Sequence, residues 1–295
     1  MLRRTLILAS ILLLTYVMPL LASATTEPAI AAATAPADLQ ALLAAAAKDP
    51  AQIPALVTQG SAEIARLATT DAKKAAELGD ALEPFCKRLF FSAETIPGSD
   101  VLGVTTHTVE KGELPSVIAK HFHISAGMLA YLNEGFDEKK MRVGQKLRVL
   151  DLSDKSVHVE VRKSVYRMFL WRTLPGGKTP ILLACMPVGL GAASSPTPEG
   201  STTILKRVRD PEWTDPDTKQ VIPASSPKNI LGGYWIALDA NTLGTTGIGF
   251  HGFTGDAPKN WIEQPASHGC VRMLQPDIDR VFHLALEGTP VAITK

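Results

Sequence analysis

The second half of the chain is a series of short apolar stretches, each ended by glycine or proline. Val157, Val159 and Val161 alternate with His158 and Glu160, which is the period-two pattern of a half-buried strand. Many short strands with such turns predict a β-rich sandwich or barrel-like domain over residues 154–295. One helix is also expected, capped by Asp277 and ended by Gly288. Further strands are expected at Val165 to Trp171, Pro180 to Val188, Ser201 to Val208, Gly233 to Leu238, Gly247 to His251 and Pro290 to Ile293.

The first 24 residues have the three-part layout of a secretory signal peptide. Arg3 and Arg4 precede an apolar run from Leu6 to Leu14, and Ala22-Ser23-Ala24 supplies a small-x-small cleavage pattern. The alternative is a retained membrane anchor. Cleavage is favoured because the run is short for a span of ~20 apolar residues and Pro19 interrupts it. We therefore expect an exported protein of the periplasm or cell wall, with no integral membrane segment after cleavage.

The region between the signal and the strands divides further by composition. Residues 25–37 are rich in Thr, Ala and Pro and are interpreted as a tether. Residues 38–96 show helical spacing, as in Leu39, Leu42 and Leu43 after the N-cap candidate Asp38. This region carries no recognisable chemistry, so we interpret it as a helical spacer or packing element.

Charge and cysteine content exclude several classes. Thirty basic and 29 acidic residues leave a formal charge of +1, which argues against a nucleic-acid binder. Three cysteines are too few for a disulfide-dense scaffold. Cys86 and Cys185 lie in apolar surroundings and are expected to be buried thiols; a bridge between them is the less favoured alternative. The acidic stretch from Asp210 to Asp217 lacks EF-hand spacing and is interpreted as a surface loop.

Residues 105–150 predict a small unit with the order strand, helix, helix, strand. Ser125 is placed to cap its second helix. The stretches HTVEKGE, IAKHFHIS, YLNE and MRVGQKLRV resemble a lysin motif (LysM) domain. That resemblance implies binding to the glycan of peptidoglycan or chitin, and the alternative is a structural unit without a ligand. The LPS sequence at 114–116 departs from the family, which usually has Thr or Leu followed by Trp or Tyr.

The chemistry is expected at residues 267–272, Ser-His-Gly-Cys-Val-Arg, and at His251. A cysteine beside a base gains thiolate character, and a thiolate–imidazolium pair would hold the pKa of Cys270 below about 8.5. The base needs a third group on its other ring nitrogen, for which a carbonyl near Gly252 is a candidate. The backbone N–H groups of Gly269 and Cys270 are candidates for an oxyanion site.

This arrangement resembles the L,D-transpeptidase catalytic domain. The signature is a His-Gly pair at His251-Gly252 and then Ser-His-Gly-Cys-x-Arg, with fifteen residues between His251 and Ser267. Thr197-Pro198-Glu199-Gly200 and Gly288-Thr289-Pro290-Val291 match further family turns. The resemblance implies that Cys270 is the nucleophile and His251 the general base and acid. It also implies that His268 positions substrate or the oxyanion, and that Gly269 offers its N–H.

The same resemblance suggests substrate-binding residues. Arg272 would pair with a substrate carboxylate, or else form a structural salt bridge. Ser267 would be a hydrogen-bonding support, Gly252 would act through its main chain, and Tyr234 would line the donor groove or pack in the core. Phe253 departs from the family, which usually has Thr or Ser after His-Gly.

The predicted reaction is acyl transfer between peptidoglycan stem peptides through a Cys270 thioester. No cofactor is expected. A zinc site made by His251, His268 and Cys270 is less favoured, since a fourth ligand is not apparent in the sequence. Two alternatives stay open: an L,D-carboxypeptidase or other hydrolase on the same substrate, and a non-enzymatic peptidoglycan-binding scaffold.

Overall fold

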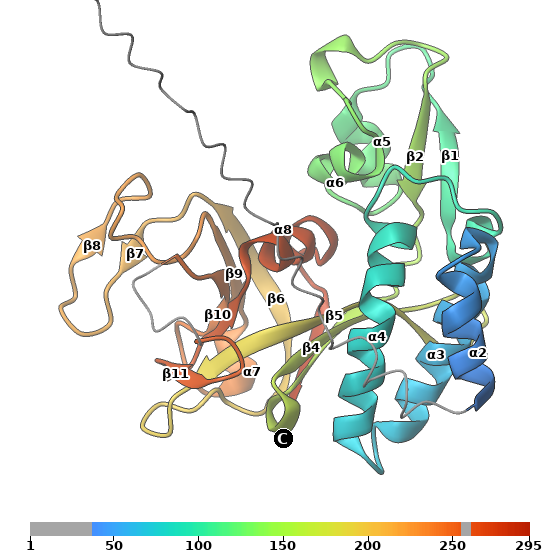
Figure 1. Ribbon diagram of the computed structural model, residues 1–295. Helices are drawn as coiled ribbons and strands as arrows, with labels where there is room; N and C mark the ends of the chain where they lie inside the picture. Colours follow the sequence, from blue (N-terminus) through green and yellow to red (C-terminus); the bar gives the residue numbers. More distant parts are fainter. Residues whose placement is uncertain (1–36, 255–260) are drawn as a thin grey trace, which may run out of the picture.

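A nine-stranded sheet forms the centre of the computed structural model, which describes residues 37–254 and 261–295 (Figure 1). Its strand order is β11-β5-β12-β10-β9-β6-β13-β3-β4. β4 also pairs with β5, so the sheet closes into a barrel-like shape, as the sequence predicts. The strands are β3 (Val157–Arg162), β4 (Arg167–Thr173), β5 (Pro180–Gly191), β6 (Gly200–Arg209), β9 (Tyr234–Leu238), β10 (Gly249–Gly252), β11 (Pro265–Ser267), β12 (Val271–Met273) and β13 (Pro290–Thr294).

β5 is the longest strand and joins two parts of the barrel. Its first residues, up to Pro187, pair with β4, whereas Val188 and Gly189 pair with β12. Leu190 and Gly191 pair with β11. One continuous strand therefore runs from the β4 side of the barrel to the segment that contains Ser267 and precedes Cys270.

The sequence reasoning missed four short strands and misplaced both ends of one helix, which stops at Leu284 and not at Gly288. β11 and β12 have three residues each. β7 (Trp213–Thr214) and β8 (Val221–Ile222) have two residues each and pair as a hairpin. All four strands are too short to show an alternation of apolar and polar residues. Helix α8 (Gln275–Leu284) begins before Asp277, with Leu274 as the N-cap and a proline in the first turn. Asp277 is therefore not a cap; it pairs with Arg280 at 2.7 Å. Short helix α7 (Ala240–Leu243) follows β9.

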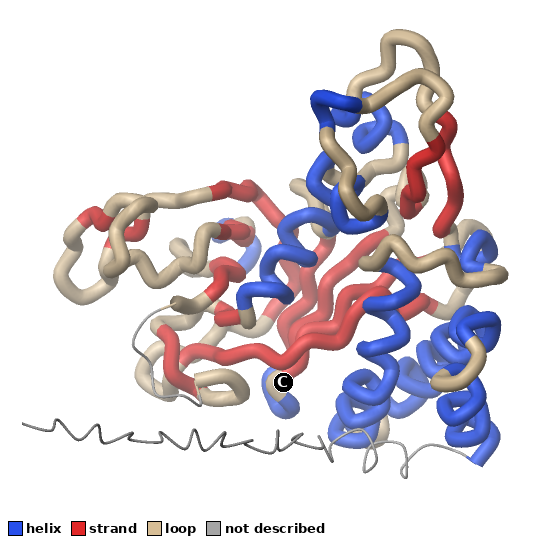
Figure 2. The backbone as a smooth tube through the Cα atoms, turned by 45° about the horizontal axis from the view of Figure 1, so that its top comes forward, coloured by secondary structure: helices blue, strands red, loops and turns tan. Residues whose placement is uncertain are grey.

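The N-terminal helices, among them α4 (Ala72–Phe90), lie beside the barrel (Figure 2). α4 starts where the Asp71 side chain accepts the N–H of Lys74, and its apolar face includes Leu78 and Leu82. Gly79 lies on that face, where a side-chain Cβ would come within 2.6 Å of Cys185 Sγ. This glycine permits the close approach of α4 to β5. The three N-terminal helices are α2 (Ala37–Ala46), α3 (Ile53–Leu67) and α4 (Ala72–Phe90).

The N-terminal helices cover the side of β5 that β4 leaves open. The N–H of Leu182 donates to Ser61 Oγ at 2.8 Å, and the N–H of Cys185 donates to Glu83 Oε2 at 2.8 Å. An open strand edge leaves backbone groups unpaired, and here helix side chains satisfy them. Cys86 and Cys185 are both buried and free, in agreement with the prediction of buried thiols.

The predicted strand, helix, helix, strand order is present in β1 (Val104–Thr108), α5 (Pro115–His121), α6 (Ala126–Leu132) and β2 (Lys146–Leu150). We call this the βααβ unit. Ser125 caps α6 as expected, accepting the N–H of Met128 at 3.2 Å. The unit contacts α8, since Ser125 Oγ lies 2.7 Å from His283 Nδ1. Gly127 permits this contact, because a Cβ there would meet the His283 ring.

The predicted signal peptide and all but the last residue of the predicted tether lie outside the described residues. Among the helices that are described, none is long and apolar enough to cross a bilayer.

Candidate active site

A cavity with a volume of about 600 Å³ is lined by Cys270, His251, His268, Arg272 and Ser267. His251 lies on β10, Ser267 ends β11, His268 and Cys270 lie in the loop between β11 and β12, and Arg272 lies on β12. The sequence separates His251 from Cys270 by eighteen residues, whereas the parallel pairing of β10 with β12 brings their segments side by side. The fold therefore gathers most of the predicted site residues in one cavity.

His251 is held in one tautomer by its own strand. It is 4% exposed and sits between Trp235 on β9 and Arg272 on β12 in the strand register. Its Nδ1 lies 2.5 Å from the Gly252 carbonyl, and a carbonyl only accepts, so Nδ1 carries the hydrogen. Nε2 is then left with a lone pair. Burial lowers the pKa of His251 from 6.5 to about 4, so the ring is neutral at pH 7.

Cys270 directly precedes β12. Its thiol donates to the Gly247 carbonyl, with Sγ 3.3 Å from the oxygen. Burial raises the pKa of this thiol above its ordinary value, against a smaller opposing effect of a hydrogen bond from the Gly249 backbone. These two shifts disfavour the predicted resting thiolate–imidazolium pair. Both shifts favour the neutral side chains in the free protein, because burial disfavours two separated charges.

The loop before the cysteine is held by Ser267. The Ser267 hydroxyl accepts the Gly269 N–H at 3.1 Å and donates to the Cys270 carbonyl at 2.6 Å. Gly269 has a φ of +111°, which favours glycine. Its N–H therefore already has a protein acceptor, and an oxyanion would have to displace Ser267 Oγ to use it.

Arg272 faces the cavity without a salt bridge among the described residues. Its guanidinium carbon lies 4.1 Å from the centre of the Phe253 ring, and its buried Nε has no hydrogen-bond partner in the described part of the chain. Phe253, the departure from the family pattern, thus supplies a cation–π contact to this arginine. Burial lowers the pKa of Arg272 below its usual value.

Tyr234 does not line this cavity. Successive residues of a strand point to opposite faces, and on β9 it is Trp235 that lines the cavity. Tyr234 packs on Phe282 of α8, with ring centres 4.7 Å apart. The prediction of Tyr234 as a groove residue is wrong, and its packing alternative agrees with this contact. Gly252 contributes through its carbonyl, and a Cβ there would collide with Gln275.

The β7–β8 hairpin forms part of the cavity wall. Glu212, Trp213 and Pro216 line the cavity, and Asp217 Oδ1 lies 3.4 Å from His268 Nε2 at the rim. The His268 side chain is 56% exposed. The acidic stretch interpreted as a surface loop therefore also faces the site. A tryptophan among four acidic residues and two prolines was the signal that could have marked it.

The part of the chain that contains this site is similar to a known family. Residues 156–293 match the YkuD family, described as the L,D-transpeptidase catalytic domain. The match runs from the β3 region into β13 and so contains the cavity.

Individual relatives are more distant. YqjB of Bacillus subtilis (strain 168), named as an L,D-transpeptidase candidate, is 32% identical over 107 residues, 36% of this chain and 57% of YqjB. The chain thus spans less than two thirds of that relative. YkuD of the same organism, named likewise, is 24% identical over 191 residues, 64% of this chain and 99% of YkuD. A solved structure of Mycobacterium tuberculosis L,D-transpeptidase 1 shows 20% identity with a TM-score of 0.33, covering 48% of this chain and 62% of that chain.

Proposed function

We propose that this protein is a peptidoglycan L,D-transpeptidase that transfers an acyl group between stem peptides through a thioester on Cys270. One observation carries the proposal: Cys270 and His251 line a single cavity within a domain matched to this family. L,D-transpeptidases act on peptidoglycan stem peptides. The hydrogen on His251 Nδ1 leaves Nε2 as the base.

The first half of the reaction forms the thioester. The Cys270 thiol gives its proton to His251 Nε2 as sulfur attacks the donor carbonyl. The carbon–nitrogen bond then breaks, and the imidazolium returns the proton to the leaving amine. Because both groups are neutral at rest, the charges appear only while substrate fills the cavity and excludes water.

The second half reverses these roles. The acceptor amine gives a proton to Nε2 and attacks the thioester carbonyl, and the carbon–sulfur bond breaks. The departing sulfur takes the proton back from the imidazolium, so the resting thiol is restored. Arg272 supplies a buried cation for a substrate carboxylate, and His268 at the rim orients the donor.

Product analysis tests this proposal against its alternatives. Purified protein would be incubated with muropeptides that carry tetrapeptide stems, and the products would be identified by mass spectrometry. We expect cross-linked dimers together with release of the terminal residue. Loss of that residue without dimers would indicate a hydrolase, and no change with folded protein would indicate a scaffold.

We also propose that the protein is exported and that the βααβ unit binds peptidoglycan glycan. Support for glycan binding comes from the motif resemblance together with exposed aliphatic side chains on the unit, Leu114 at 60% and Val143 at 67%. Aliphatic groups of this kind suit the apolar faces of sugar rings. A backbone hydrogen bond joins the loops that carry Leu114 and Val143, since the Val109 carbonyl accepts the Gly144 N–H at 2.8 Å.

Co-sedimentation with insoluble peptidoglycan tests the glycan site in the full chain. Leu114→Asp and Val143→Asp are expected to lower the bound fraction. Leu205→Asp is the matched control, because Leu205 is equally exposed at 59% but lies on β6, outside the unit. Equal binding by all three variants and wild type would contradict a glycan site on these loops.

A further inference from the structure

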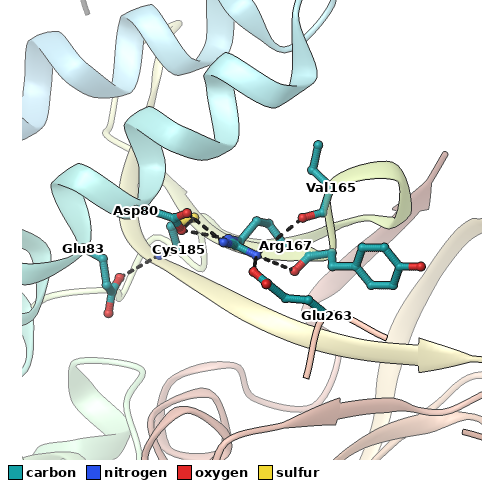
Figure 3. A network of polar contacts seen from close by, with 7 residues as sticks. Asp80, Glu83, Val165, Arg167, Cys185 and Glu263 are labelled. Carbon is teal, nitrogen blue, oxygen red and sulfur yellow. Dashed lines mark hydrogen bonds and ion pairs between the residues drawn. The ribbon is translucent and has the colours of Figure 1, made fainter. Parts of the chain in front are cut away.

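Helix α4 presents two carboxylates to the barrel, Asp80 and Glu83, one turn apart (Figure 3). Each carboxylate holds an arginine that belongs to the barrel region, Arg167 on β4 or Arg280 on α8. Ion pairs between a helix and the domain that follows it are not required for that helix to link two domains. These two pairs suggest that α4 has a role in the catalytic part of the chain.

Arg167 is the centre of the larger network. Its Nε and Nη2 donate to the two oxygens of Asp80, each at 2.7 Å, which is a bidentate pair. Its Nη1 donates to the Tyr166 carbonyl at 3.2 Å and also contacts Glu263. The arginine side chain is only 15% exposed. One guanidinium therefore joins α4 to the segment around Glu263.

Glu263 begins the segment that leads into the catalytic loop. Its φ is +58°, a left-handed conformation that is unfavourable for a residue with a side chain and persists where surrounding contacts hold it. The Glu263 N–H donates to the Val188 carbonyl at 3.0 Å, and the Leu190 N–H donates to the Gln264 carbonyl at 2.9 Å. Four positions after Glu263, Ser267 bonds the Cys270 carbonyl.

A second connection reaches the same loop through β5. Glu83 accepts the Cys185 N–H at 2.8 Å with one oxygen and contacts Arg280 Nη1 at 2.5 Å with the other. Six residues beyond Cys185, Gly191 pairs with Ser267. Both carboxylates of α4 thus act on segments that continue directly to the loop carrying Cys270.

We propose that Arg167 is a positioning residue for the transfer reaction, and that it fixes the loop before Cys270 by joining Asp80 of α4 to Glu263. The N-terminal helices are then part of the catalytic unit and not a spacer. This inference rests on the proposed function, because it concerns the placement of the proposed nucleophile. A lysine cannot replace the arginine, since an ammonium lacks the planar fork that holds two carboxylates at once.

Three single variants of the full chain and one double variant test the inference. Arg167→Lys keeps the charge and loses the fork, and Glu263→Gln weakens the link at a side chain that is 46% exposed. Arg66→Lys is the matched control, because Arg66 makes the same bidentate contact with Glu63 on the surface of α3. Two rates would be measured for each: acylation of Cys270 by a soluble tetrapeptide donor, and alkylation of Cys270 by iodoacetamide.

We expect acylation kcat to fall about tenfold in Arg167→Lys and Glu263→Gln, with KM nearly unchanged, because misplacement by a fraction of an ångström impairs attack. Alkylation should become a few-fold faster, since a displaced loop exposes the thiol. The double variant should be no slower than Arg167→Lys alone, because both changes break one link. Arg66→Lys should match wild type in both rates.

Wild-type rates in a folded Glu263→Gln would overturn the inference, even if Arg167→Lys failed to fold. A lower melting temperature with both rates unchanged would also overturn it, because that is the signature of a purely structural pair. If the wild type itself were not acylated, the proposed function would fail separately. The alkylation rates would then decide the inference on their own, and unchanged alkylation in both variants would reject it.

Discussion

The three cysteines of this chain occupy two very different environments. Cys86 and Cys185 lie between α4 and β5 and are fully buried, whereas Cys270 is partly accessible and lines a cavity with His251. Burial raises the pKa of all three thiols, and for Cys86 and Cys185 it does so by far more. A raised thiol pKa therefore does not distinguish the proposed nucleophile, Cys270, from the other two cysteines.

Access and a neighbouring base are what separate Cys270 from the other two. Cys185 lies near the carboxylates of Asp80 and Glu83, whose negative charges disfavour a thiolate, while the nearby Arg167 acts in the opposite direction. Cys270 has instead a neutral imidazole in its cavity, which can take a proton during attack. The comparison teaches that the proposed nucleophile would be activated during the reaction and not at rest.

The largest effect is expected from removing the nucleophile. Cys270→Ala should lower turnover by about a thousandfold or more, because the covalent route is lost while the cavity stays intact. Cys86→Ala is the control at a buried thiol and should retain turnover within about twofold. If Cys270→Ala formed cross-linked dimers at a near wild-type rate, Cys270 would not differ in function from the buried thiols Cys86 and Cys185, and the comparison would fail.

The next largest effect concerns the base. His251→Gln should slow acylation of Cys270 by about a hundredfold or more, since glutamine fills the space but accepts no proton. His268→Gln should cost only a few-fold, because His268 lies at the exposed rim. Stopped-flow acylation with a soluble donor gives both values. A larger loss for His268→Gln would reverse the roles of the two histidines.

A pH profile sharpens the comparison of the thiols. Because burial raises the Cys270 pKa, its alkylation by iodoacetamide in the free protein should keep rising above about pH 8.5. At pH 7 the rate should be about tenfold below that of an activated thiolate. His251→Gln should leave the profile nearly unchanged, because the imidazole is neutral. An alkylation rate that no longer rises above about pH 7 would instead support a resting thiolate–imidazolium pair.

The smallest effect is on stability. The pKa of His251 falls from 6.5 to about 4 on folding, so the folded protein binds fewer protons than the unfolded chain between these values. Its contribution is complete above pH 6.5 and is lost as the pH falls towards 4. From about pH 7 to 5.5, urea unfolding should show wild type losing about 1 kcal/mol more than His251→Gln. Equal losses would mean that His251 is not held neutral.

Sequence reasoning did well where the signal is local. The run from Ser267 to Arg272 and the histidine at 251 predicted residues that the structure gathers in one cavity. The valine alternation after Ser156 was sufficient to predict strand β3. Ser125 was correctly placed as a cap because capping is a contact within one turn. A carbonyl near Gly252 was expected as the partner of His251, and the Gly252 carbonyl has this role. This contact is local because Gly252 follows His251 directly in the chain.

The failures concern contacts that depend on the tertiary fold. The burial that keeps Cys270 and His251 neutral comes from several strands at once, and nothing in the local motif reports it. Tyr234 and Trp235 are equally good groove candidates until the strand face is known. The pairing of Asp80 with Arg167 joins residues 87 positions apart, so α4 looked like a spacer in the sequence.

The central claim, acyl transfer through the one thiol in the cavity, is tested most directly by mapping the covalent intermediate. The full-length protein would be incubated with a tetrapeptide donor without acceptor, quenched in acid, and digested for peptide mass spectrometry. We expect an acyl adduct on Cys270 that hydroxylamine removes, as it does a thioester, with Cys86 and Cys185 unmodified. An adduct on another residue, or dimer formation with no adduct on Cys270, would contradict the account.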